Sequence, residues 1–461
     1  MAERKPPVQR NDDIALTIDA LGAEGQGIGR VDGYAVFVPG ALPGERVRAH
    51  IIKAGSGFGV GKLMKIEAPA PERVDPPCAI FAACGGCALQ HMEYGAQLAY
   101  KRKVVEDALV RIGGLKDIRV SPVLGMDDPW RYRNKGSFPL ANAGPRVETG
   151  FFSPRSHRLV PMPDCLIQQQ NVLQAAYAVR DWANQYDIPA YDEQTGNGLL
   201  RHVVARASCS GEAMATVVAT GTLPHKKELL EFLQKQVDGL ASVYLNIQRA
   251  KSNVILGDDY RLLWGKEKIE EQLCGLVFSL GPASFLQVNP SQTERLYATA
   301  LDLFALTGGE RVVDAYCGIG TITLLLARSA REVIGIENVP EAVEDARRNA
   351  QRNGMRNAQF LCEESEAALP RLIREGMALD ALVMDPPRKG ADEAFLRAVI
   401  ESGVKRVLYI SCNPATLARD CRILADGGYH VRTVQPVDMF PHTVHVETVI
   451  LMTKCGLKEK I

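Results

Sequence analysis

The chain has 461 residues, 46% hydrophobic and 23% charged, which excludes a mostly disordered chain, a collagen-like chain and a small disulfide scaffold. Its 54 Lys and Arg residues equal its 54 Asp and Glu residues, so any nucleic-acid site must come from local clustering of charge. The absence of a run of about 18 apolar residues, a polar start without a signal-peptide core, and an odd number of Cys together predict a cytoplasmic protein with no membrane partner.

The N-terminal region, residues 1–70, contains short alternating runs at 14–18, 34–38 and 46–52 that are punctuated by glycines. This pattern predicts a small antiparallel β-barrel of about five strands. A proline-rich stretch over 68–77 then indicates a linker.

The central region, residues 71–280, begins with apolar residues at helical spacing over 94–113 and then mixes strands and helices without one dominant period. From residue 281 to 461 the chain alternates between buried strands and helices. The segments 312–314, 332–336, 380–384 and 406–410 are short apolar runs typical of parallel strands. The fold class is therefore α/β, with a doubly wound sheet in the C-terminal region.

A glycine-rich loop follows the first of these strands, with Gly318 and Gly320 just before a helix that begins at Thr321. Glycines at a strand-to-helix turn let the backbone approach a ligand. Glu337 follows the next strand, where a carboxylate can accept hydrogen bonds from both ribose hydroxyls. Only two glycines are present, which favours S-adenosylmethionine (SAM) over NAD. The alternative is a glycine-rich loop of another α/β protein.

Two further strands end in residues suited to chemistry. Asp385 precedes Pro386 and Pro387, which would hold a rigid loop at the carboxyl edge of the sheet or form a plain tight turn. Cys412 lies at a strand end and near a helix N-terminus, a position expected to lower its pKa and favour the thiolate.

Such a thiolate can activate C5 of a pyrimidine by adding to C6. The reaction then needs a base to remove the C5 proton. Glu447 is the candidate, in a predicted strand over 443–451. If each residue is considered without the other, Cys412 could be a buried structural thiol and Glu447 could be a solvent-exposed charge.

Four cysteines form a possible metal site: Cys78, Cys84 and Cys87, spaced by five and two residues, and the distant Cys165. Four thiolates suit zinc or a [4Fe–4S] cluster, and the unequal spacing differs from paired zinc knuckles. The third alternative is that these four cysteines are free thiols that bind no metal.

A basic patch over 131–158 interleaves cations with aromatic side chains, as phosphate contacts and base stacking require. Its cations are Arg131, Arg133, Lys135, Arg146, Arg155 and Arg158, and its aromatic residues are Tyr132, Phe138, Phe151 and Phe152. The alternative is a solvated surface over core aromatics. Arg388 and Lys389, near the predicted active site, are further candidates for phosphate contacts.

In the order of its motifs the chain resembles the RNA uracil-5-methyltransferase family, in particular the bacterial 23S rRNA branch with a TRAM barrel and a [4Fe–4S] cluster. The motifs are Ser284-Phe-Leu-Gln-Val-Asn-Pro290, Asp314-Ala-Tyr-Cys-Gly-Ile-Gly320, Asp385-Pro-Pro-Arg388, Ser411-Cys-Asn-Pro414 and His445-Val-Glu-Thr448. The resemblance implies a Rossmann-like SAM methyltransferase domain, an N-terminal OB-like barrel and an α+β central iron–sulfur domain, with residues 94–120 packing on the catalytic domain.

The resemblance also implies roles for single residues. Gln287, Tyr316, Glu337 and Asp385 would bind SAM, and Glu364 or Glu366 would reach the adenine. Cys412 would be the nucleophile, Glu447 the base, and Phe285 would lie near the target base. Cys78, Cys84, Cys87 and Cys165 would hold the cluster.

The implied activity is methylation of a single-stranded or flipped-out uridine of 23S rRNA to 5-methyluridine, by a monomer. Three alternatives remain: a tRNA uracil-5-methyltransferase, an RNA cytosine-5-methyltransferase, and a non-catalytic RNA-binding protein. A tRNA enzyme from bacteria would typically lack the barrel and the Cys cluster. A cytosine enzyme usually carries its Cys in a different motif.

Overall fold

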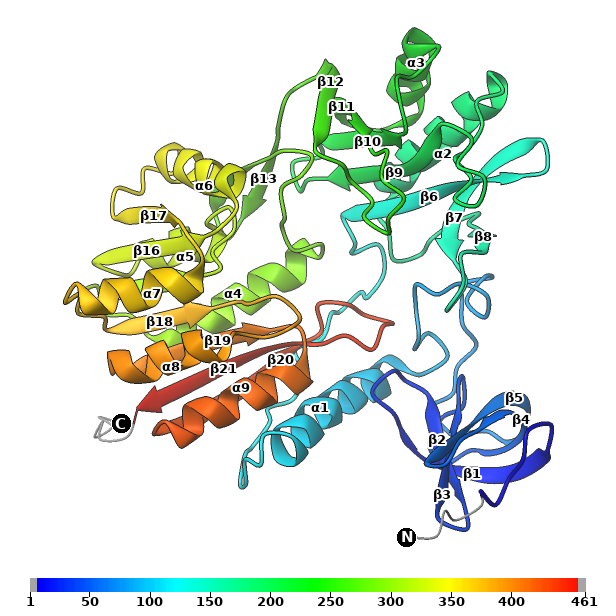
Figure 1. Ribbon diagram of the computed structural model, residues 1–461, viewed down its shortest axis with the longest axis horizontal. Helices are drawn as coiled ribbons and strands as arrows, with labels where there is room; N and C mark the ends of the chain where they lie inside the picture. Colours follow the sequence, from blue (N-terminus) through cyan, green and yellow to red (C-terminus); the bar gives the residue numbers. More distant parts are fainter. Residues whose placement is uncertain (1–5, 455–461) are drawn as a thin grey trace.

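The computed structural model describes residues 6–454, which form an N-terminal barrel, a central α+β region and a C-terminal α/β region (Figure 1). Among these residues, none of the helices combines the length and the apolar character needed to span a bilayer. No disulfide joins the described cysteines.

The barrel is closed in the strand order β1-β2-β3-β5-β4, so that its sheet has no free edge. Alternation explains its core: along β4, Val47, Ala49 and Ile51 are buried between exposed or half-exposed neighbours. The strands are β1 (Asp13–Leu21), β2 (Gly27–Val31), β3 (Tyr34–Val38), β4 (Arg46–Ala54) and β5 (Phe58–Ala68).

The central region contains a seven-stranded sheet of order β12-β11-β10-β9-β6-β7-β8, in which only β10 and β11 pair in parallel. Helices α2 and α3 contribute to one hydrophobic core with this sheet, around the fully buried Trp182. The elements are β6 (Lys135–Ala143), β7 (Arg146–Phe152), β8 (Leu159–Pro161), α2 (Gln170–Gln185), β9 (Leu200–Ala207), β10 (Ala213–Ala219), α3 (Lys226–Gln236), β11 (Leu240–Ile247) and β12 (Asp259–Gly265).

Helix α1 (Tyr94–Arg111) precedes this sheet in the chain but lies beside α9 of the C-terminal region (Figure 1). Its buried residues Val105 and Leu109 share a hydrophobic core with the last helices of the chain. The segment after it forms parallel bridges at Val120 and Leu124 to the edge strand β20. Residues 94–124 therefore extend the C-terminal region.

The C-terminal sheet has the order β17-β16-β15-β18-β19-β21-β20, and β21 alone runs antiparallel to its neighbours. The strands are β15 (Arg311–Ala315), β16 (Glu332–Glu337), β17 (Ala358–Cys362), β18 (Ala381–Met384), β19 (Arg406–Ser411), β20 (Tyr429–Val437) and β21 (Glu447–Lys454). The helices are α4 (Pro290–Phe304), α5 (Thr321–Ala327), α6 (Pro340–Arg352), α7 (Ser365–Arg374), α8 (Glu393–Ser402) and α9 (Pro414–Asp426).

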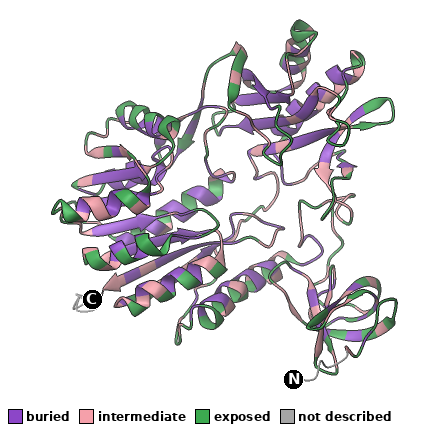
Figure 2. Cartoon of the chain, in the orientation of Figure 1, coloured by how far each residue is buried: buried purple, intermediate pink, exposed green. Residues whose placement is uncertain are grey.

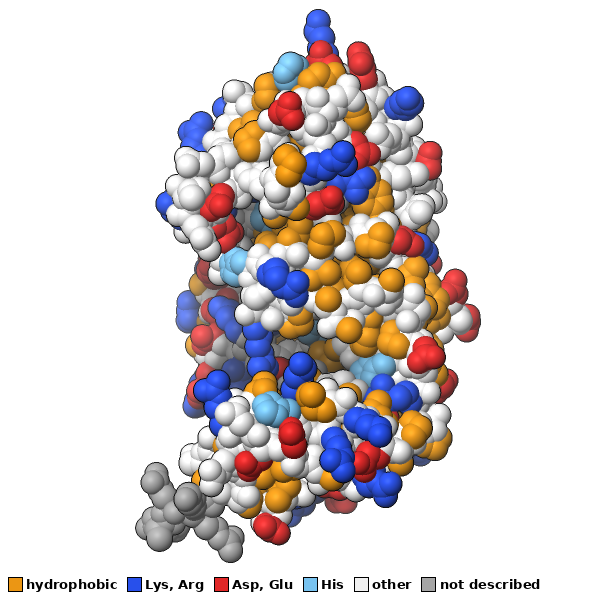
Figure 3. Space-filling view, turned by 90° about the vertical axis from the view of Figure 1, so that its right-hand side faces the viewer, with side chains coloured by type: hydrophobic (Ala, Val, Ile, Leu, Met, Phe, Trp, Pro, Cys, Tyr) orange, Lys and Arg blue, Asp and Glu red, His pale blue; other side chains and the backbone are white. Residues whose placement is uncertain are grey.

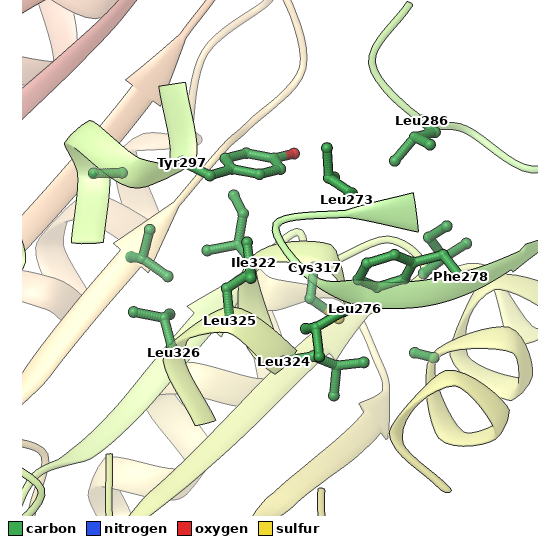
Figure 4. Close-up of a cluster of buried hydrophobic side chains, with 14 of the residues drawn as sticks. Leu273, Leu276, Phe278, Leu286, Tyr297, Cys317, Ile322, Leu324, Leu325 and Leu326 are labelled. Atoms are coloured by element: carbon green, nitrogen blue, oxygen red, sulfur yellow. The ribbon is translucent and has the colours of Figure 1, made fainter. Parts of the chain in front are cut away.

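Each face of this sheet has its own core, and the central strands are buried on both faces (Figure 2). Val312 and Leu408 point to the face covered by α4, α5 and α6, whereas the next residues, Val313 and Tyr409, point to the face covered by α7, α8 and α9. The hairpin of β13 (Ile269–Leu273) and β14 (Leu276–Leu280) closes the first core, where Phe278 packs near Leu324 and Cys317 (Figure 4).

Three points differ from the expectations. The barrel is not wholly antiparallel, because β3 and β5 pair in parallel; a closed ring with an odd number of strands cannot keep every neighbouring pair antiparallel. The predicted strand over 443–451 begins only at Glu447, because Thr443 and His445 use their backbone N–H groups in local bonds, to the Phe440 carbonyl at 3.2 Å and to the Thr443 hydroxyl at 3.2 Å. The edge strands β17 and β20 and the β13–β14 hairpin were not predicted, since their sequences mix polar and apolar residues.

Candidate active site

The glycine-rich loop leaves the carboxyl end of β15 in a left-handed backbone conformation. Tyr316, Gly318 and Gly320 have φ values of 66°, 55° and 85°. A Cβ on Gly320 would lie 3.1 Å from the ring of Phe360, so glycine lets the loop lie against the neighbouring strand. The left-handed Tyr316 is uncommon for a side chain of its size, and it directs its hydroxyl to Glu366 at 2.9 Å.

Glu337 ends β16 and faces this loop. Its Oε2 accepts a hydrogen bond from the Gly318 N–H at 3.0 Å, and its Oε1 accepts from the N–H groups of Asn338 and Val339 at 2.9 and 3.0 Å. Three backbone donors thus fix the carboxylate at the mouth of the loop, where the sequence placed a ribose-binding acid.

The two acids proposed to reach the adenine lie close together but have different partners. Glu364 accepts a hydrogen bond from the Asn338 side chain at 2.9 Å, and Glu366 accepts from Tyr316. Oε2 of Glu366 is buried without a partner. Both acids line the same cavity as Glu337, so the choice between them stays open.

Gln287 and Phe285 lie on the segment before α4, which also lines the cavity. Gln287 is buried, whereas Phe285 is 69% exposed. Arg206, from β9, donates a hydrogen bond to the Ser284 carbonyl at 2.6 Å and so holds the segment that carries Phe285 and Gln287. Arg206 was not a sequence candidate, because no local signal links it to a segment 78 residues away.

Cys412 and Glu447 meet across the sheet. The antiparallel register of β19 and β21 ends with Ser411 opposite Thr448, and continuing it by one step would set Cys412 opposite Glu447; the charge of Glu447 does act on the Cys412 thiol. Residues opposed in this way have Cα atoms roughly 4.5–5.5 Å apart and side chains on the same face. Asn413 caps α9 directly after the thiol by accepting from the Ala415 N–H at 3.0 Å.

Asp385 follows β18 and completes a group of acids around the thiol. Burial raises the pKa of Glu447, and the nearby Asp385 raises it further, while Arg388 lowers it. Burial also raises the pKa of Asp385. Oε2 of Glu447 is buried without a hydrogen-bond partner, in keeping with a carboxyl group that faces a ligand.

The expectation of a lowered Cys412 pKa is wrong. Burial, followed by the negative charges of Glu447 and Asp385, raises the pKa of Cys412 to about 11, while Arg388 and a backbone hydrogen bond oppose this shift. These effects outweigh the helix N-terminus. This shift favours the protonated thiol, and a further positive charge beside it would favour the thiolate.

One cavity of about 1800 Å³ joins these groups. It extends from Glu337 past Asp385, Cys412 and Glu447, and it also contains Arg133 and Lys135. A cavity of this size is larger than a cofactor pocket requires and leaves room for a nucleotide.

The four sequence-predicted metal ligands Cys78, Cys84, Cys87 and Cys165 line the same cavity. Burial raises the pKa of Cys87 to about 12 and of Cys165 to about 11, and the other thiols of the set add to both shifts. The four side chains are therefore neighbours. Within residues 6–454, however, no group of three or more His, Cys, Asp or Glu residues is arranged to hold a metal ion.

The basic patch is only partly available to RNA. Arg131 forms two hydrogen bonds with Asp164, at 2.9 and 2.6 Å, and Arg155 pairs with Glu24 of the barrel at 3.5 Å. Tyr132 and Phe138 are buried, so these rings cannot stack on bases. Figure 3 shows Lys and Arg side chains around the hollow above the barrel.

Comparison of this chain with known proteins shows which family it belongs to. The model described as tRNA (Uracil-5-)-methyltransferase matches residues 207–455, and the TRAM domain model matches residues 7–64. A protein of Halalkalibacterium halodurans, named an uncharacterized RNA methyltransferase, is 46% identical over 98% of this chain and 99% of its own length. A protein of the same description from Clostridium tetani is 44% identical over 98% of this chain and 99% of its own.

A solved structure extends the likeness to the fold. The tRNA (uracil-54, C5)-methyltransferase of Pyrococcus abyssi, in complex with S-adenosyl-L-homocysteine, is 27% identical. The match has a TM-score of 0.77 and covers 95% of this chain and all of that one. The catalytic fold is thus that of a SAM methyltransferase preceded by a small β-barrel. The chain belongs to the family of SAM-dependent RNA uracil-5-methyltransferases that carry a TRAM domain.

Proposed function

We propose that this enzyme forms 5-methyluridine in 23S rRNA, with Cys412 as nucleophile and Glu447 as base. The observation that carries the assignment of roles is that these two residues directly adjoin the last pair of the β19–β21 ladder, Ser411 and Thr448, at the same end of the two strands. Both line the cavity that also contains Glu337.

In the proposed reaction the Cys412 thiolate adds to C6 of the uracil ring, which makes C5 nucleophilic. C5 then takes the methyl group of SAM, and S-adenosylhomocysteine is released. Glu447 accepts the proton from C5 while the bond between C6 and the sulfur breaks, which restores the C5–C6 double bond and the thiolate.

The raised pKa values of Cys412, Asp385 and Glu447 make their ionisation dependent on the charge of the bound cofactor. SAM supplies an electrophilic methyl group on a sulfonium cation, and a positive charge beside Asp385 would favour the ionised forms of Asp385, Glu447 and Cys412. We therefore expect the thiolate and the carboxylate to form together once the site is loaded, with Arg388 assisting from the rim.

The target uridine must leave a duplex to reach the cavity, because a stacked base hides C5 and C6. Arg133 and Lys135 line the cavity wall and suit the adjoining phosphates. Burial, Arg206 and Arg133 lower the pKa of Lys135 to about 7, so a phosphate there would relieve the repulsion between like charges. The exposed Phe285 is placed to contact the base.

We further propose that Cys78, Cys84, Cys87 and Cys165 hold a [4Fe–4S] cluster. The four thiols are half-buried and line one cavity, and Cys78 and Cys84 lie close enough for their charges to raise the pKa of both Cys87 and Cys165, so a metal group could take the place of the thiol protons. The donor set fits four-thiolate ligation, and the Gly86 N–H already donates to Cys84 Sγ at 3.3 Å. The cluster would stabilise this segment, since methylation needs no electron transfer.

The choice of 23S rRNA rests on the sequence resemblance, above all on the Cys spacing. A specific observation favours tRNA as the second candidate. The Pyrococcus abyssi tRNA enzyme matches 95% of this chain, so the barrel region does not by itself separate the two substrates.

The deciding experiment offers unmodified 23S rRNA and unmodified tRNA separately to anaerobically purified protein with methyl-labelled SAM. After digestion to nucleosides, labelled 5-methyluridine from 23S rRNA alone is the expected result. Label from tRNA would transfer the activity to that substrate, and 5-methylcytidine would refute the choice of base. Cys412→Ala should abolish both methylation and the covalent adduct, so that labelled product from this variant would contradict the nucleophile assignment.

A further inference from the structure

The loop that delivers the proposed base is held from outside the sheet. This base loop, residues 438–446, joins β20 to β21 and ends directly before Glu447. Five consecutive carbonyls of the loop accept hydrogen bonds from other parts of the chain. The donors are Gln292 to Asp438 (3.0 Å), Asn289 to Met439 (3.1 Å), Lys101 to Phe440 (2.9 Å), Tyr132 to Pro441 (3.1 Å), and the N–H groups of Ala88 and Leu89 to His442 (both 2.9 Å).

A buried ion pair fixes the start of the loop. Lys101 of α1 and Asp438 are both fully buried, and Lys101 Nζ contacts Asp438 Oδ1. The Tyr94 hydroxyl donates to the other carboxylate oxygen at 2.9 Å. Such a pair adds little net stability over an apolar contact, but it is sensitive to displacement, because separating the partners leaves a charge buried alone. It therefore specifies one loop position.

A strained residue fixes the middle of the loop. His442 has a φ of 65°, and its ring stacks on Trp130 with centroids 3.8 Å apart. Gln97 bonds both the backbone N–H of His442, at 3.1 Å, and the ring Nδ1, at 3.3 Å. A non-glycine residue keeps this conformation only when its surroundings over-determine it.

We infer that the base loop is a positioning element. Through it, the cysteine segment (residues 78–89) and α1 fix the position of the Glu447 carboxylate. The Ala88 and Leu89 donors directly follow Cys87, so order in the cysteine segment is transmitted to His442 through two hydrogen bonds. This inference rests on the proposed roles of Cys412 and Glu447.

These hydrogen bonds to the loop carbonyls form a clamp on the base loop. The inference predicts which reaction step slows when one of the bonds is removed. Cys412 lies on β19, outside the loop, so the C6–sulfur bond still forms and the methyl group is still transferred. A displaced Glu447 removes the C5 proton slowly, and the methylated RNA then remains bound to Cys412. A general loss of stability would instead lower adduct formation and turnover together.

Tyr132→Phe is the sharpest test, because it deletes only the hydroxyl that bonds the Pro441 carbonyl. Tyr244→Phe is the matched control: Tyr244 is also buried and donates to a carbonyl, that of Glu267 at 2.8 Å, away from the loop. We expect turnover of Tyr132→Phe to fall about 5- to 10-fold, which corresponds to one lost hydrogen bond. The fraction of enzyme in the RNA adduct on denaturing gels should rise, while the control keeps both values.

Two further measurements keep the inference falsifiable if Tyr132→Phe folds poorly. Tyr94→Phe removes a bond to Asp438 and should shift the same balance toward the adduct. In Cys87→Ser, amide hydrogen exchange over 438–446 should accelerate, without any need for activity. Adduct fractions of Tyr132→Phe and Tyr94→Phe equal to those of the control, or unchanged exchange in Cys87→Ser, would overturn the clamp. A wild-type enzyme that turns over but never forms an adduct would instead overturn the proposed function.

Discussion

Glu337 offers a prediction whose size follows from its hydrogen bonds. A carboxylate has about four acceptor positions, and three are filled by the N–H groups of Gly318, Asn338 and Val339. One position therefore remains for a ribose hydroxyl, where the sequence alone suggested two. A hydrogen bond to a charged group contributes about 1.5–3 kcal/mol. Glu337→Gln should weaken the binding of S-adenosylhomocysteine by about 10- to 150-fold.

Isothermal titration of the ligand into wild-type and Glu337→Gln protein measures this directly. Glu363→Gln is the control, because Glu363 lies close by in the sequence but bonds Arg371, at 2.8 Å, rather than the loop. Affinity of Glu337→Gln within about threefold of the wild type, with the protein folded, would refute the contact. A loss beyond about a thousandfold would refute the count of one free position.

Three other predictions address the proposed catalytic pair, the buried acid Asp314 of β15 and the glycine-rich loop. Glu447→Gln should transfer the methyl group but trap the RNA on Cys412, so that denaturing gels show a stable adduct; rapid release would exclude Glu447 as the base. Burial raises the pKa of Asp314 to about 7, so the folded protein holds a proton that the unfolded chain releases near pH 4. Stability should therefore fall as pH rises from about 4 to about 7, and Asp314→Asn should flatten this trend in a thermal-unfolding series; parallel curves would contradict it. Gly320→Ala should lower the melting temperature more than Gly318→Ala, because both have positive φ but only the first would crowd Phe360; equal losses would show that the ring moves aside.

The sequence predicted best those parts of the fold that depend on local pattern. The strands of the parallel sheet are apolar runs such as Val312-Val313 and Leu408-Tyr409, buried on both faces, and their ends carry the predicted loops. Glycine and proline at fixed spacings then located Gly318 and Asp385 at one sheet edge. Apolar runs and the spacing of glycine and proline are local properties, so they predict these elements independently of the remainder of the chain.

What escaped prediction depends on contacts between distant segments. The pKa of Cys412 is set by Glu447 and Asp385, which outweigh the local helix terminus. Tyr132 looks like a stacking residue in a basic patch, yet it is buried and bonds Pro441. A strand expected from residue 443 begins at 447, because the N–H groups of Thr443 and His445 bond within the loop instead of to a strand.

The insertion of β21 between β19 and β20 has a consequence for the birth of the enzyme. Chains emerge from the ribosome N-terminus first, so the barrel, the cofactor loop and the strand leading to Cys412 can all fold before β21 is made. Glu447 opens that last described strand, and its arrival fills the gap between two strands already present. A chain that terminates before β21 would thus lack both the proposed base, Glu447, and the strand that separates β19 from β20.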